Sequence, residues 1–151
     1  MILQPGTAAP DFALQNQFGQ TVALADFRGV SPVTLVFFPL AFSRTCQGEL
    51  GELRDHLDVF AEAGSQLVAI SVDSKHSLRA WGEEQGYDFP LLADFWPHGA
   101  VASAYGAFHD ERGYANRATF VIDADGIIRA SFATAPGEAR TLEQYRAALA
   151  S

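Results

Sequence analysis

Two continuous apolar runs dominate the hydrophobic pattern of this chain. They are residues 33–38 (VTLVFF), which Pro39 ends, and residues 66–72 (QLVAISV). Runs of this length without polar alternation are typical of strands that are buried on both faces of a sheet. The shorter pair Leu91-Leu92 predicts a third buried strand.

Helical periodicity follows each of the two long runs. One set of apolar residues recurs at intervals of three, four and three, and consists of Leu50, Leu53, Leu57 and Phe60. This spacing predicts one continuous helix that ends before Gly64. Residues 75–85 predict a second helix with Gly86 as its stop signal. Residues 96–105 predict a short helix opened by Pro97, and residues 139–150 a final amphipathic helix.

Two turn signals predict β-hairpins. Residues 12–14 and 21–24 flank the turn-like segment 16–19 (NQFG) near the N-terminus. Further along, residues 119–122 and 127–132 flank 123–126 (DADG), whose Asp-Gly pair is a strong hairpin signal.

The order of these elements predicts the fold class. Strand–helix–strand units indicate a parallel core, and a late antiparallel hairpin followed by a helix makes the sheet mixed. We therefore expect an α/β fold: a thioredoxin-like mixed sheet flanked by helices on both faces, with an N-terminal β-hairpin extension. No linker or repeat divides the chain, so residues 1–151 are expected to form a single domain.

Charge narrows the range of partners. The 151 residues include 18 acids and 10 bases, for a formal net charge of −8. That balance argues against binding to nucleic acid or to an anionic membrane surface. The first residues lack the basic and apolar blocks of a signal peptide, and no apolar run is long enough for a membrane helix. The cytoplasm is the expected location.

A single cysteine, Cys46, limits the possible chemistry further. It excludes an internal disulfide and a four-cysteine metal site. None of the four histidines has a metal-binding spacing, and no glycine-rich phosphate motif is present. We therefore expect neither a metal nor a cofactor.

The position of Cys46 suggests an activated thiol. It follows a buried strand and a seven-residue connection and lies where a helix begins, so helix N–H groups can stabilise its thiolate. Arg44, two residues earlier, can add positive potential. By itself, however, a lone cysteine is more often an inert, small buried residue. Its neighbours argue for activation: Pro39, Ser43 and Cys46 form P-x-x-x-S-x-x-C, and the Ser43 hydroxyl can hydrogen-bond a bound peroxide.

This segment resembles the peroxiredoxin signature, P-x-x-x-T/S-x-x-C, and the similarity extends over nearly the whole chain. Residues 9–12 (APDF) resemble the opening of the peroxiredoxin family. Four longer blocks are similar to the one-cysteine subfamily called alkyl hydroperoxide reductase E, known from actinobacteria. These blocks are residues 35–42 (LVFFPLAF), 46–50 (CQGEL), 89–100 (FPLLADFWPHGA) and 115–123 (ANRATFVID).

The resemblance implies a role for each candidate site residue. Cys46 would be the peroxidatic cysteine, shielded from water by Pro39, and Ser43 would hydrogen-bond the peroxide. Arg117 would hold the thiolate and polarise the substrate, and Glu49 would support the site through hydrogen bonds. From the residues alone, Arg117 can also be a surface arginine at a strand end, and Glu49 a surface acid on a helix.

The implied activity is that of a thiol-dependent peroxidase. The Cys46 thiolate would attack hydrogen peroxide or an organic hydroperoxide and become a sulfenic acid. Without a second cysteine, an external thiol must recycle it: a low-molecular-weight thiol such as mycothiol, or a glutaredoxin- or thioredoxin-like protein. Two alternatives stay open. One is a peroxide sensor that relays oxidation to a partner, and the other is a thiol–disulfide exchange protein, although Ser43 occupies the first cysteine position of C-x-x-C.

Aromatic residues near the site bear on assembly. Phe42 and the segment Phe95-Trp96-Pro97 are predicted to lie in loops or short elements, where large side chains either cap the local core or meet a partner. Many peroxiredoxins pair beside the active site. A homodimer whose interface includes these residues is therefore expected.

Overall fold

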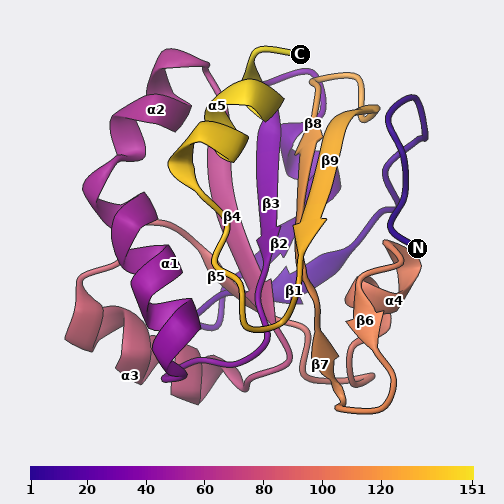
Figure 1. The fold of residues 1–151 in the computed structure, drawn as a ribbon. Coiled ribbons are helices and arrows are strands. Elements are labelled where there is room, and N and C mark those ends of the chain that lie inside the picture. The colour runs from indigo at the N-terminus through magenta and orange to yellow at the C-terminus, as the bar shows by residue number, and fades with distance from the viewer.

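A seven-stranded mixed sheet forms the centre of the computed structural model, which describes residues 1–151 (Figure 1). Its strands are β1 (Ala13–Gln15), β2 (Thr21–Ala23), β3 (Val33–Phe37), β4 (Gln66–Ser71), β5 (Leu91–Ala93), β8 (Arg117–Ile122) and β9 (Ile128–Thr134). They lie in the order β2-β1-β5-β4-β3-β8-β9. The two predicted hairpins are both present: β1 pairs with β2 at one edge of the sheet, and β8 with β9 at the other.

Strand β3 lies inside the sheet, where its apolar sequence requires it to be. It runs parallel to β4 and antiparallel to β8, and all five of its residues are buried. Leu35 and Phe37 contribute to one hydrophobic core, whereas Val36 and the following Phe38 contribute to a second. A continuous apolar strand therefore supplies both faces of the sheet.

Helices cover both of these faces. Helices α1 (Arg44–Asp55), α2 (Leu57–Glu62), α3 (Lys75–Gln85) and α5 (Leu142–Leu149) contribute side chains to the core that contains Phe38. The opposite core receives side chains from α4 (Ala100–Ala104), from the 3₁₀ helix η1 (Leu24–Phe27) and from the N-terminal segment. Figure 1 shows α1 and α2 on one side of the sheet and α4 on the opposite side. The predicted fold class is thus confirmed.

The helix predicted from Leu50 to Phe60 is interrupted, so the expectation of one continuous helix was wrong. His56 has φ −131° and ψ 36°, which ends α1 before α2 begins at Leu57. The His56 N–H bonds the Leu53 carbonyl, a three-residue spacing that tightens the end of α1. Only His56 leaves the helical conformation, so the apolar residues on either side of it keep a helical spacing in the sequence. The sequence pattern therefore does not reveal the break.

Two other helices begin later than predicted. Helix α4 starts at Ala100, and its N-cap is Gly99 in a left-handed conformation (φ 69°), so Pro97 lies outside the helix. The buried Asp94 carboxylate accepts the N–H groups of Val101 and Ala102 and so fixes this start. Helix α5 begins at Leu142 rather than Ala139, because Thr141 caps it.

A third hairpin, which forms a separate two-stranded sheet, was not predicted from the sequence. It consists of β6 (Phe108–His109) and β7 (Tyr114–Ala115), each two residues long. Strands this short cannot display the alternation by which a strand is predicted.

Candidate active site

Cys46 is the third residue of α1, at the carboxyl end of the central strand β3, as its sequence position predicted. Pro39, which follows the buried strand, is itself buried, and the chain then turns through residues 40–43 into the helix. The Cys46 side chain has no solvent-exposed surface. N–H groups in the first turn of a helix lack carbonyl partners within that helix, so the sulfur lies where an anion is favoured.

Arg117, the first residue of β8, reaches the sulfur from across the sheet. Its Nη1 donates to Cys46 Sγ at 3.2 Å and to Glu49 Oε1 at 2.7 Å. Its Nε donates to the Pro136 carbonyl at 2.7 Å, which fixes the plane of the guanidinium. One arginine thereby joins the first turn of α1, the start of β8 and the loop after β9.

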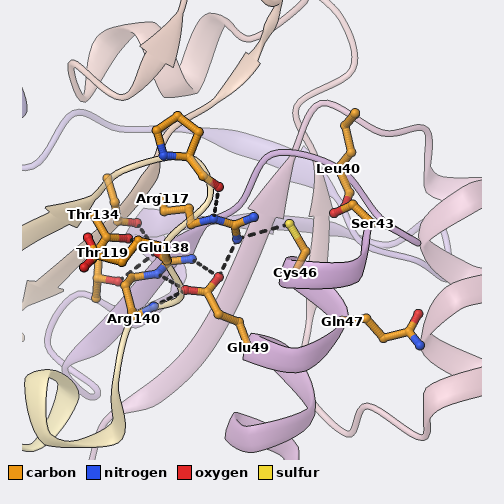
Figure 2. A network of polar contacts seen from close by, with 12 residues as sticks. Leu40, Ser43, Cys46, Gln47, Glu49, Arg117, Thr119, Thr134, Glu138 and Arg140 are labelled. Carbon is orange, nitrogen blue, oxygen red and sulfur yellow. Dashed lines mark hydrogen bonds and ion pairs between the residues drawn. The ribbon is translucent and has the colours of Figure 1, made fainter.

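A second arginine, Arg140, holds the other side of Glu49. Its Nε donates to Oε2 at 2.9 Å, its Nη2 to Oε1 at 3.0 Å and its backbone N–H to Oε2 at 2.6 Å. Its Nη1 also donates to the Ala118 carbonyl and the Thr119 hydroxyl of β8. Figure 2 shows the resulting chain of contacts from Arg140 through Glu49 and Arg117 to Cys46.

The three charged side chains of this network are buried. Glu49 is 4% exposed, Arg117 3% and Arg140 4%, so neither Glu49 nor Arg117 is the surface residue that the sequence had left open. Burial alone raises the pKa of Glu49, but hydrogen bonds and positive charge, mainly from Arg140 and then from Arg117, outweigh it and hold that pKa below its ordinary value. Glu49 is therefore a carboxylate at neutral pH.

Ser43 lies on the other side of the sulfur from this network (Figure 2), and Pro39 lies four residues earlier in the same loop. Ser43 is the residue before α1, and its hydroxyl donates to the Leu40 carbonyl at 2.8 Å rather than to a group of the site. The loop that contains both residues is anchored because the Ala41 N–H donates to the Asp73 carboxylate at 2.7 Å. The structure thus joins Cys46 and Glu49 through Arg117, which contacts both, and places Ser43 and Pro39 in the adjoining loop.

Arg140 was missing from the sequence-based site. It lies 91 residues after Glu49, in a segment that follows Pro136-Gly137 and carries no recognisable motif. An arginine just before a helix is ordinary on a protein surface, so only the three-dimensional contact distinguishes it. Arg44, by contrast, is the exposed first residue of α1 and forms no ion pair.

No three side chains among the histidines, cysteine, aspartates and glutamates are grouped so as to hold a metal ion. None of the helices has the length and apolar character needed to cross a membrane.

Comparison with known proteins assigns this combination of fold and buried thiol to a family. Residues 5–131 match the model of the AhpC/TSA family. The chain is 50% identical over 150 residues to alkyl hydroperoxide reductase E of Mycobacterium tuberculosis (strain H37Rv), covering 99% of this chain and 98% of that protein. It is 35% identical over 136 residues to peroxiredoxin-2 of Mus musculus, covering 83% of this chain and 67% of the mouse protein.

A solved structure supports the same family. The crystal structure of peroxidoxin BcpB from Mycobacterium tuberculosis superposes with a TM-score of 0.84 at 29% identity, over 98% of this chain and 95% of that one. The chain therefore belongs to the AhpC/TSA family. Within it, the protein is a peroxiredoxin with one cysteine, a thiol-dependent peroxidase similar to the mycobacterial alkyl hydroperoxide reductases E.

Proposed function

We propose that Cys46 is the nucleophile of this peroxidase and that it reduces hydrogen peroxide and organic hydroperoxides. The observation that supports this best is the 3.2 Å contact between Arg117 Nη1 and Cys46 Sγ at the first turn of α1. A cation and a helix N-terminus directed at one sulfur favour its thiolate, the reactive form. Nothing else in the chain offers a sulfur that can form a thiolate.

In the proposed reaction, the thiolate attacks the distal oxygen of the hydroperoxide. A sulfur–oxygen bond forms, the oxygen–oxygen bond breaks, and the alkoxide or hydroxide that leaves takes a proton from water. Arg117 and the N–H groups of the first turn stabilise the negative charge that moves onto the oxygens. Ser43 orients the peroxide by turning its hydroxyl from the Leu40 carbonyl toward the substrate, while the buried Pro39 keeps bulk water from the sulfur.

Glu49 and Arg140 are proposed as positioning residues. Glu49 accepts from Arg117 Nη1, the same nitrogen that contacts the sulfur, and Arg140 fixes both oxygens of Glu49. Any displacement of Glu49 would therefore move the guanidinium away from the reacting atoms, and small displacements of this kind slow catalysis strongly.

Recycling of the sulfenic acid is assigned to an external thiol, because Cys46 has no cysteine partner in its own chain. We propose a low-molecular-weight thiol such as mycothiol, or a glutaredoxin- or thioredoxin-like protein. Compartments that keep such thiols reduced are cytosolic, so we propose that the protein acts in the cytoplasm.

The active form is proposed to be a homodimer that pairs through Phe42 and the segment Phe95-Trp96-Pro97. Three large aromatic side chains of this surface are exposed: Phe42 by 50%, Phe95 by 54% and Trp96 by 80%. With so much of each ring in solvent, none of the three is buried in the core of its own chain, and aromatic residues are enriched at the centres of interfaces.

Stopped-flow oxidation with hydrogen peroxide and cumene hydroperoxide tests the site. Cys46→Ser should fold and show no peroxide reduction. Arg117→Lys, which keeps the charge but loses the forked donors, should slow oxidation about a hundredfold. Arg129→Lys, a change on the exposed side of β9, is the matched control and should oxidise at the wild-type rate. Turnover by Cys46→Ser would remove Cys46 from the reaction.

A second measurement separates turnover from sensing. With an added thiol and excess peroxide, a peroxidase consumes many equivalents of peroxide per chain. A sensor is oxidised once and stops, even though its first chemical step is the same.

A further inference from the structure

The loop between β3 and α1 is strained, and its own backbone does not hold it in shape. Phe42 has φ 66°, and it is the only residue other than glycine with a positive φ, a conformation that is costly for a side chain of this size. Residues 39–42 form no hydrogen bond with another backbone group. The Phe42 ring lies 6.2 Å from that of Trp81 and is 50% exposed. A strained conformation persists only where neighbouring groups impose it, so other contacts must fix this loop.

Two side chains supply the hydrogen bonds of this loop. The Ser43 hydroxyl donates to the Leu40 carbonyl at 2.8 Å, and the Ala41 N–H donates to Asp73 Oδ2 at 2.7 Å. In the proposed reaction Ser43 turns its hydroxyl to the peroxide, so its bond to Leu40 is broken while substrate is bound. Asp73 is then the only hydrogen-bonding partner that the backbone of residues 39–42 retains.

Ser71, the buried last residue of β4, fixes the carboxylate of Asp73. Its hydroxyl donates to Asp73 Oδ2 at 2.6 Å and accepts the Asp73 N–H at 3.3 Å. These two bonds form a closed ring that sets the direction of the carboxylate. Strand β4 runs parallel to β3, with Ile70 opposite Phe37, so the residues that follow β4 lie beside the loop that follows β3.

We propose that Asp73 is a positioning residue of the peroxidase and that Ser71 orients it. By holding the Ala41 N–H, Asp73 maintains the left-handed turn at Phe42, which directs Ser43 and the first turn of α1 toward the peroxide. The inference rests on the proposed function, because it presupposes that a peroxide binds at Cys46.

The proposal separates two properties of the site. Arg117 reaches the Cys46 sulfur from β8 and does not depend on this loop, so the thiolate should persist without Asp73. Removal of a negative charge cannot by itself disfavour an anionic sulfur. Asp73 should therefore affect the orientation of the peroxide and not the formation of the thiolate.

Two reactions of the same sulfur distinguish these properties. Oxidation by hydrogen peroxide needs a thiolate and an oriented peroxide. Alkylation by iodoacetamide, which forms a sulfur–carbon bond and releases iodide, needs the thiolate but no oriented peroxide. The ratio of the two second-order rate constants, oxidation over alkylation, therefore reports the orientation of the peroxide.

Four variants test Asp73 and Ser71 through this ratio. Asp73→Ala removes the acceptor and should lower the ratio about tenfold. Asp73→Asn keeps an oxygen for Ala41, and its amide nitrogen can replace Oδ1, which accepts no hydrogen bond, so the ratio should stay within about threefold of wild type. Ser71→Ala, which frees the carboxylate to rotate, should lower it about threefold. Asp88→Ala, at an exposed aspartate, is the matched control and should leave it unchanged.

The comparison of Asp73→Ala with Asp73→Asn isolates the acceptor, because both variants lose the same charge. A wild-type ratio in Asp73→Ala, even if both rates fall together, would overturn the proposal. So would a ratio in Asp73→Asn as low as that in Asp73→Ala. If circular dichroism shows that Asp73→Ala does not fold, Ser71→Ala decides, and a wild-type ratio there would overturn the proposal. Failure of the wild-type protein to react with peroxide at all would instead overturn the proposed function.

Discussion

The buried charges around Cys46 sum to zero only when its sulfur is a thiolate. Arg117 and Arg140 contribute two positive charges and Glu49 one negative charge, all within one connected set of contacts. A single positive charge then remains, and Cys46 is the group in contact with it. Uncompensated charge is costly inside a protein, so the network itself favours the anionic sulfur.

Glu49→Gln tests this balance through stability. The folded-state pKa of Glu49 lies below its ordinary value of 4.5, so the carboxylate contributes stability above about that pH. The contribution is lost as the pH falls through the lower, folded-state pKa. At pH 7, Glu49→Gln should lower the free energy of unfolding by about 3 kcal/mol, because two buried guanidinium groups lose their carboxylate.

Urea denaturation at a series of pH values checks this prediction. The difference between wild type and Glu49→Gln should narrow as the pH is lowered below about 4.5. A difference that stays constant from pH 7 to pH 3 would show that the ionised carboxylate is not what stabilises the fold.

Three residues of this network, Cys46, Glu49 and Arg117, could be predicted from the sequence, whereas Arg140 could not. Cys46 and Glu49 are three residues apart on one helix, so their proximity follows from helical geometry. Arg117 was included only through a resemblance to a family. Arg140 lies in the loop between β9 and α5, which the predicted final helix had included, and only the pairing of β9 in the sheet and the packing of α5 on its face bring this residue to Glu49.

At the scale of elements, the hydrophobic pattern predicted the strands and helices that are defined by burial. It did not predict the helix ends that depend on backbone conformation. The buried strands β3 and β4 and the helix α3 were located closely, with Gly86 as the end of α3, because apolar runs and a glycine stop are strong local signals. The break at His56 and the late start of α4 at Ala100 depend on single residues in unusual conformations. Such conformations leave no periodic trace in a sequence.

Two glycines in helices should respond in opposite directions to the same change. Gly86 ends α3 with φ 70°, where a side chain is strained, so Gly86→Ala should lower the free energy of unfolding by about 1 kcal/mol. Gly48 lies inside α1, and a Cβ there would meet no atom within 4 Å. Gly48→Ala should raise the free energy of unfolding by about 0.5–1 kcal/mol through helix propensity.

Urea midpoints of the two variants, measured side by side, decide this prediction. The rate of peroxide oxidation should remain that of the wild type in both, since neither residue contacts the site. Equal midpoints for the two variants would mean that backbone conformation does not limit stability at these positions.

At the scale of the whole molecule, two properties bear on the association of two copies. A net charge of −8 makes two chains repel each other, more strongly at low than at high salt. The exposed aromatic rings of Phe42, Phe95 and Trp96 favour burial. Because attraction through apolar surface depends much less on salt than charge repulsion does, we expect the dimer to become tighter as the ionic strength rises.

Sedimentation at micromolar concentration tests the proposed dimer. The wild type should sediment at twice the chain mass of 16.3 kDa, whereas Trp96→Arg should shift toward the mass of one chain. Val30→Arg is the matched control, because Val30 is 76% exposed and undergoes the same change in charge. Val30 precedes the start of β3, whereas Trp96 follows the end of the parallel strand β5, so the two residues lie at opposite ends of the sheet. Both variants reduce the negative charge of each copy and so weaken the repulsion. Dissociation of Trp96→Arg alone would therefore identify the aromatic surface as the interface, and identical masses for all three proteins would refute it.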